Sequence, residues 1–309
     1  MVELAPTELV AVWGWFADPL EFEFMRRALL AVALVAVVSA VVGAFVVVRG
    51  MAFIGDALAH ASFAGVAAAV ALGVSIYLGA IVAAVATALG IAFISQRGRL
   101  RFDTAIGVLF VGAFALGIVI ISRQDNYTAD LFSFVFGNVL GVSWNDLLLM
   151  AVIGAAVVLL IAVFYKELLF IAYDPTAAAA AGIPTRLLEY GLLALVALST
   201  VVALQAVGIV LVIAMLVTPA ATANLLVRRL HHVIFVAVGL ALAAAVTGLY
   251  VSYHAGVASG ASIVLVATAF FIAALLVAPR RGVFARRRFQ RARRDRFQAE
   301  ATAAEQAAP

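Results

Sequence analysis

Apolar runs of about 20 residues recur along most of this chain, and they restrict its fold more than any other feature. A helix of that length crosses the hydrocarbon core of a bilayer and satisfies all of its own backbone hydrogen bonds. Of the 309 residues, 67% are hydrophobic and only 12% are charged, whereas soluble domains carry roughly 25% charged residues. The sequence therefore predicts an all-α, polytopic integral membrane protein with about eight or nine transmembrane helices.

The predicted order of segments begins with an interfacial stretch, residues 1–25, which is acidic and aromatic and does not have the pattern of a cleavable signal peptide. Residues 122–145 start polar and then become apolar over too short a run to span, which favours a re-entrant or interfacial helix. Residues 283–309 form a basic and then low-complexity cytoplasmic tail. The predicted spans are residues 28–48, a second span that carries Asp56 and His60 and ends near 72, then 75–94, 104–121, 147–165, 188–204, 207–226, 233–253 and 261–278.

The loop charges predict the orientation, because cytoplasmic loops of membrane proteins carry an excess of Lys and Arg. With the C-terminus in the cytoplasm, the loops that fall inside hold most of the basic residues: Arg49, residues 97–101, residues 166–186 and residues 228–229. The loops that fall outside hold only Arg123 and His254. Arg26 and Arg27 disagree with this arrangement, but the other loops outnumber them, so we expect the N-terminus outside.

Asp56 and His60 are the main candidate site, because they lie four residues apart within an apolar span and therefore share one helical face. Ionisable groups inside a bilayer are costly and usually functional. A carboxylate oxygen and an imidazole nitrogen together suit a divalent first-row metal. The alternative is structural, with the two side chains bridging each other or a neighbouring helix.

A second candidate is the stretch from Asp174 to Pro184, which has the signals of a short helix in a cytoplasmic loop. Asp174 is placed to cap the helix and Pro175 to occupy its first turn, while Gly182 ends it and Pro184 prevents its continuation. Such a helix could dock on a soluble partner. The plainer interpretation is an ordinary connector between spans.

Other sequence features narrow the possible functions. The chain has no cysteine, which excludes disulfides and thiolate metal sites, and it has no Walker-type phosphate loop. A net charge of +4 concentrated in the tail does not indicate nucleic-acid binding. We interpret His231 and His232 as interfacial residues on different helix faces, Gln205 as a turn residue and Pro219 as a helix kink.

Three stretches together resemble the metal-uptake ABC-3 permease family, the membrane subunits of zinc, manganese and iron ABC importers. The most specific is Gly55-Asp56-Ala57-Leu58-Ala59-His60-Ala61 within residues 48–61. The others are residues 207–223, which contain Thr218-Pro219, and residues 252–265 with the closing Pro279-Arg280-Arg281-Gly282. The likeness covers nearly all of residues 24–282.

The resemblance implies a homodimeric permease in the plasma membrane that translocates zinc, manganese or iron and binds no cofactor of its own. It implies cytoplasmic ATPase subunits that hydrolyse ATP and an extracytoplasmic metal-binding protein, with lipid around the chain and no nucleic acid. Asp56 and His60 match the family's intramembrane metal pair, and residues 172–186, with Asp174, Pro175, Gly182 and Pro184, match its coupling segment. The chain departs from the family at Gly256 and Ala258, so no ligand, His254 included, is assigned in that loop.

Two alternatives stay open at this point. A secondary carrier or channel could use Asp56 and His60 as a proton relay, although the inverted repeat typical of such carriers is not evident in this sequence. A permease for a non-metal substrate is a further possibility.

Overall fold

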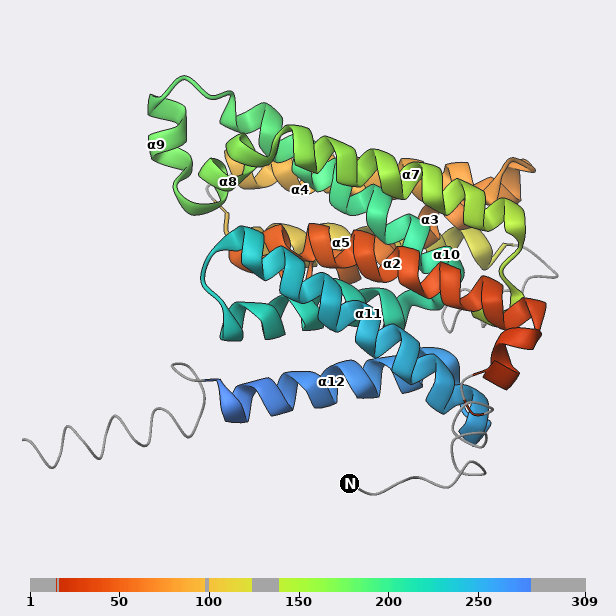
Figure 1. The fold of residues 1–309 in the computed structure, drawn as a ribbon. Helices are drawn as coiled ribbons and strands as arrows, with labels where there is room; N and C mark the ends of the chain where they lie inside the picture. Colours follow the sequence, from red (N-terminus) through yellow and green to blue (C-terminus); the bar gives the residue numbers. More distant parts are fainter. Residues whose placement is uncertain (1–14, 16, 98–99, 124–138, 279–309) are drawn as a thin grey trace, which may run out of the picture.

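The computed structural model describes residues 15, 17–97, 100–123 and 139–278, and this part of the chain is helical, with no strand. Eight long helices form the bundle in Figure 1, and two short helices and one 3-10 turn connect them. The long helices are α2 (Glu23–Val48), α3 (Ile54–Leu72), α4 (Ile76–Arg97), α5 (Phe102–Ile121), α7 (Trp144–Val163), α10 (Thr185–Leu226), α11 (Leu230–Ala255) and α12 (Ser259–Val277). The short elements are η1 (Val139–Gly141), α8 (Tyr165–Tyr173) and α9 (Pro175–Ala180).

Helix α10 contributes two membrane spans, so the described residues hold nine candidate spans in eight long helices. Its 42 residues would extend about 63 Å if straight, twice the roughly 30 Å thickness of a hydrocarbon core. The helix breaks at Gly208, where φ is 74° and ψ is 170°, a conformation that glycine adopts without a Cβ clash. The chain then returns to the end of the bundle from which it came (Figure 1).

This break corrects one expectation from the sequence. Gln205 lies in helical backbone and is not a turn residue, because the non-helical dihedral angles belong to Gly208 three residues later. Pro219 lies inside α10 without non-helical dihedral angles, and the kink expected at this proline stays a prediction.

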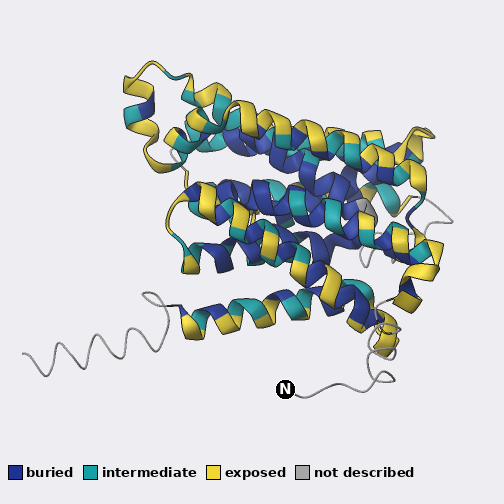
Figure 2. Cartoon of the chain, in the orientation of Figure 1, coloured by how far each residue is buried: buried dark blue, intermediate teal, exposed yellow. Residues whose placement is uncertain are grey.

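Small residues bring the central helices into close contact. A Cβ built on Gly43 of α2 would lie 1.8 Å from the backbone oxygen of Leu216 in α10. A Cβ built on Gly65 of α3 would lie 1.9 Å from the backbone oxygen of Gly79 in α4. In an apolar 18-residue stretch of α2 and in one of α3, 72% of the stretch is buried inside the chain. In the corresponding stretch of α5 only 17% is buried. Figure 2 shows the same contrast between a buried centre and an exposed periphery.

The helix bounds agree with the predicted spans to within a few residues, with one clear difference at the start. Helix α2 begins at Glu23, five residues before the predicted first span, and the interfacial position of residues 1–25 stays a prediction. Most of the predicted re-entrant stretch, residues 122–145, and all of the predicted tail, residues 283–309, lie outside the described residues.

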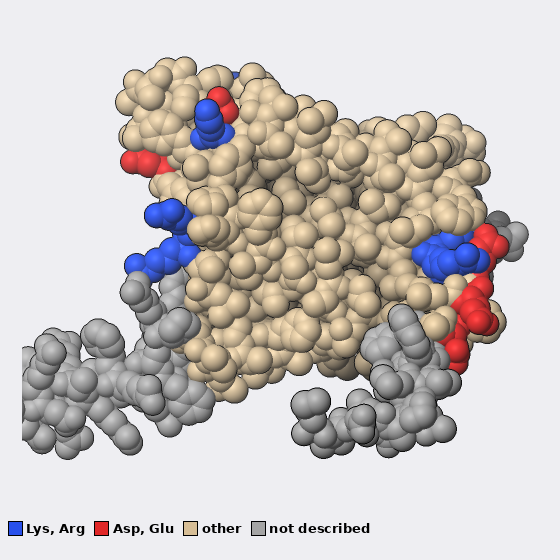
Figure 3. Space-filling model, viewed as in Figure 1, with Lys and Arg blue, Asp and Glu red and all other residues tan. Residues whose placement is uncertain are grey.

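Charged side chains gather at the two ends of the bundle. Figure 3 shows both basic and acidic side chains at the end that carries α9, and acidic side chains beside a basic group at the opposite end. The orientation in which the α9 end faces the cytoplasm stays a prediction from the loop charges.

Candidate metal pair and coupling segment

Asp56 and His60 lie on one face of α3, as their spacing predicts. The Nδ1 atom of His60 lies 3.0 Å from Asp56 Oδ1 and 3.0 Å from the backbone oxygen of Asp56. The opposite ring nitrogen, Nε2, and the second carboxylate oxygen of Asp56 form no hydrogen bond with a described residue. The pair therefore has one donor atom on each side chain left for a ligand.

Aromatic side chains of α5 hold the imidazole ring from the side. The rings of Phe110 and Phe114 lie edge-on to His60, with centroids 5.2 and 5.4 Å away. Helix α5 approaches this closely because it carries Gly117, where a Cβ would lie 2.7 Å from the ring of Phe63 on α3. The ring of His60 is thus oriented by its own helix and by its neighbour.

The pair is not sealed inside the chain. The side chain of His60 is 27% exposed and that of Asp56 is 34% exposed, although most of α3 is buried. Among the described residues, no group of three or more His, Cys, Asp or Glu side chains is placed to hold a metal ion. One chain therefore offers a metal ion two side chains here, and further ligands must come from water or from a second chain.

The short helix expected at residues 174–182 is present as α9. The backbone N–H of Ala177 donates to Asp174 Oδ1 at 2.8 Å, and Pro175 occupies the first turn. Gly182 has a φ of 82° and ends the segment, and Pro184 is the cap residue that precedes α10. Apart from Ala178, which is buried, the helix is largely exposed at one end of the bundle (Figure 1).

A part-buried network that the sequence did not reveal joins α2, α4 and α10. Arg49, directly after α2, forms an ion pair with Glu189 in the first turns of α10. The side-chain N–H of Gln96 donates to the second carboxylate oxygen of Glu189 at 2.8 Å. The sequence shows only that Arg49 and Glu189 carry opposite charges at span ends predicted to lie on the same side of the membrane. That signal does not identify them as a pair, because they are 140 residues apart.

The remaining histidines lie apart from the metal pair. His254 stacks on Trp15 at a centroid distance of 4.3 Å, and its Nε2 lies 3.1 Å from the backbone oxygen of Trp15. His231 and His232 begin α11, and their ring centroids are 4.1 Å apart. The two imidazole rings thus meet across the roughly 100° that separates adjacent positions on a helix, and the prediction that both residues are interfacial stays a prediction.

Comparison with known proteins decides the family. The family model described as the ABC 3 transport family matches residues 21–278. The chain belongs to this family. A relative called manganese transport system membrane protein MntC, from Halalkalibacterium halodurans, is 46% identical over 272 residues, which cover 88% of this chain and 93% of the relative.

Two further matches extend the comparison. A probable iron transport system membrane protein from Haemophilus influenzae is 37% identical over 264 residues, covering 85% of this chain and 97% of that relative. Among solved structures, PsaBC from Streptococcus pneumoniae in complex with Fab gives a TM-score of 0.78 at 38% identity, and the match covers 87% of this chain and 97% of that one.

These findings confirm the resemblance seen in the sequence. The chain is a multi-pass plasma-membrane permease of the ABC-3 metal-uptake class, and it is a transport subunit and not an enzyme. Family membership removes the support for a proton-coupled secondary carrier.

Proposed function

We propose that two copies of this chain form the translocation path of an ATP-driven importer for a divalent transition metal, with manganese as the leading substrate. The observation that carries the proposal is the Asp56–His60 pair, with its unused donor atoms and its partial exposure. The manganese and iron transport named for the relatives supports the substrate class.

The number and type of side chains that a metal ion requires support a site made by two copies of this chain. Two chains about a twofold axis would supply two carboxylates and two imidazoles, a mixed set that suits manganese, iron or zinc. Calcium prefers six to eight oxygens, and magnesium gives up its water reluctantly, so both should be poor substrates. Zinc should bind such ligands more tightly than manganese, as the general order of divalent affinities requires.

Asp56 also has a structural use, since an acidic residue in the first turn of a helix interacts favourably with the helix dipole. That use does not account for His60, which places a nitrogen with no partner among the described residues on the same face. Both side chains together are explained by a cation.

The proposed coupling to the ATPase runs from α9 to the metal pair through covalent and buried contacts. Helix α9 leads through Pro184 into α10, where Glu189 pairs with Arg49. Arg49 stands seven residues before Asp56 and is joined to α3 by a short turn. ATPase subunits at the α9 end would act on this route, and an extracytoplasmic metal-binding protein would deliver the ion to the opposite end.

A stoichiometric titration tests the proposal. Purified full-length chain is titrated with Mn²⁺ and followed by electron paramagnetic resonance, and we expect one bound ion per pair of chains. The Asp56→Asn variant should lose that binding, while Asp103→Asn, which changes an exposed acid in the first turn of α5, should keep it. Unchanged binding by Asp56→Asn, or one ion for every chain, would contradict the proposed site.

A further inference from the structure

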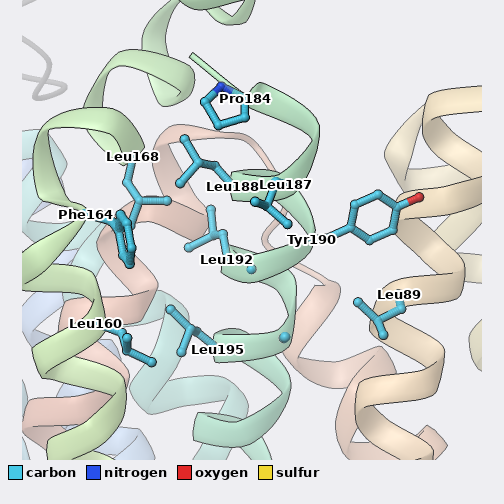
Figure 4. A pocket seen from close by; sticks show the side chains of 12 residues that line it. Leu89, Leu160, Phe164, Leu168, Pro184, Leu187, Leu188, Tyr190, Leu192 and Leu195 are labelled. Carbon is cyan, nitrogen blue, oxygen red and sulfur yellow. The ribbon is translucent and has the colours of Figure 1, made fainter.

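An apolar cavity of about 460 Å³ opens between α4, α7, α8 and α10, within the size range of ligand sites in proteins. Figure 4 shows leucine side chains and Phe164 converging on it beneath Pro184. Of the twelve lining residues, only Tyr190 has a polar side-chain atom, and its hydroxyl points away from the leucines (Figure 4). The wall therefore suits a hydrocarbon and offers a polar ligand no partner.

A second cavity, of about 310 Å³, adjoins the first through Tyr190, which lines both. Its other walls are Phe93, Gln96, Arg97 and Arg186. Arg97 is the last residue of α4, and Arg186 is the second residue of α10. Both cavities thus meet where these helices reach the α9 end of the bundle.

The two arginines have no acidic partner of their own. Both are exposed, and neither forms an ion pair with any residue that the structure describes. Arg97 lies over the ring of Phe93, 4.6 Å from its centroid. Glu189, the nearby acid, is already bound by Arg49 and Gln96. The second cavity therefore has two positive charges available for an anion.

We propose that the two cavities together bind one anionic phospholipid, with an acyl chain among the leucines and the phosphate group between Arg97 and Arg186. A free anion would have no use for the apolar cavity, and an uncharged hydrocarbon would have no use for the arginines. The cytoplasmic leaflet, where the orientation places this end, is rich in anionic lipid that attracts basic residues. The proposal depends on membrane insertion and not on the transported ion.

A lipid in the apolar cavity would lie next to the coupling segment. Pro184, which joins that segment to α10, lines the apolar cavity together with Leu168 of α8. An acyl chain in the cavity would fill the space between α8 and α10 on either side of α9. Lipid occupancy should therefore influence how α9 is held.

Native mass spectrometry of the purified full-length chain tests the site, with phosphatidylglycerol compared with phosphatidylcholine of the same acyl chains. The Arg97→Gln/Arg186→Gln variant should bind phosphatidylglycerol roughly tenfold more weakly, because it removes both guanidinium groups that line the second cavity and would contact the phosphate. The control Arg228→Gln/Arg229→Gln removes two arginines between α10 and α11 at the same end and should bind as the native chain does.

The apolar cavity is tested with Gly191→Leu. Gly191 lines the cavity, and a Cβ there meets no atom within 4 Å, so the new side chain can fill the space without disturbing the fold. The control is Gly239→Leu in α11, where a Cβ is equally unobstructed. We expect Gly191→Leu to lose phosphatidylglycerol and Gly239→Leu to retain it.

Four results of the lipid-binding measurements would overturn the proposal. These are unchanged lipid binding in the Arg97→Gln/Arg186→Gln variant, an equal loss in the Arg228→Gln/Arg229→Gln control, equal binding of phosphatidylcholine, and displacement of the lipid by inorganic phosphate alone at matched concentration. A chain-to-chain disulfide formed by Leu187→Cys, a cavity residue that is 70% exposed in a cysteine-free chain, would show that a second copy covers the cavity, and it would also overturn the proposal.

Discussion

Two groups of polar side chains lie in this apolar bundle: the Asp56–His60 pair, and the network of Arg49, Gln96 and Glu189. They differ in how exposed their side chains are and in how many of their polar atoms have partners. In the network, the side chains of Arg49 and Glu189 are 11% and 15% exposed, and both carboxylate oxygens of Glu189 have partners. In the metal pair, the side chains are about twice as exposed, and each keeps a donor atom with no partner in the described part of the chain.

This difference separates a polar group that joins helices from one that has donor atoms left for a ligand. Glu189 satisfies its charge across three helices, so it holds those helices in one arrangement. Asp56 and His60 satisfy each other only in part, and both belong to the same helix, so their contact does nothing to join helices. The cost of placing them in a membrane must be offset by another interaction, and binding a cation supplies it.

The largest expected effect comes from removing the metal pair. The Asp56→Ala/His60→Ala variant should lose metal uptake by roughly 100-fold or more, since losing coordinating groups removes most of the affinity. Its thermal unfolding midpoint should stay near that of the native chain, because the Asp56–His60 contact lies within one helix and only the ring contacts of His60 with Phe110 and Phe114 are lost between helices. Isotope uptake by vesicles containing the permease with its ATPase measures this, with Asp103→Ala/His254→Ala as the control. Native uptake rates in the pair variant would make Asp56 and His60 structural.

Breaking the network of Arg49, Gln96 and Glu189 should lower the stability of the fold. Glu189→Ala leaves Arg49 buried without its carboxylate, which typically costs about 3–5 kcal/mol. We expect a lower thermal unfolding midpoint in detergent and less folded protein. The double variant Arg49→Met/Glu189→Leu should recover much of that stability, because apolar replacement of a buried ion pair is often neutral. If Glu189→Ala unfolds at the native temperature, the network is not structural.

A smaller effect is expected at the coupling segment. Gly182→Arg places a bulky charge at the exposed end of α9 and should reduce ATPase co-purification and uptake by roughly tenfold, with the bundle still folded. Gly73→Arg is a matched control, because Gly73 has a φ of 67° against 82° at Gly182, and a Cβ at either position is unobstructed. Gly73 ends α3 at the opposite end of the bundle (Figure 1). Normal metal-driven ATP turnover by Gly182→Arg would contradict docking at α9.

The smallest effect is the dependence of uptake on pH. A protonated imidazole cannot bind a metal, so uptake should fall several-fold as the pH is lowered from about 8 to about 5, the range in which histidines change their charge. Uptake is measured in vesicles with the pH set equal on both sides. The His254→Gln variant should show the same pH profile, which would assign the effect to a different histidine. Uptake that does not change across this range would argue against an imidazole ligand.

Features that depend on neighbouring residues could be predicted from the sequence alone. The helical spans follow from the length of the apolar runs. The Asp56–His60 contact follows from a four-residue spacing on one helix, and α9 follows from Asp174, Pro175 and Gly182 at its ends. In each case the determining interactions lie within about one helical turn, so no knowledge of packing is required.

Only the tertiary structure decided the features that join distant helices. Arg49 and Glu189 are 140 residues apart, and the apolar cavity is formed by four helices. The position of the break in α10 at Gly208, and not at Gln205, likewise depends on where the helix must reverse to pack against α2 and α3. A sequence lists the charges and glycines, but the faces that helices turn toward one another depend on the fit of many side chains at once.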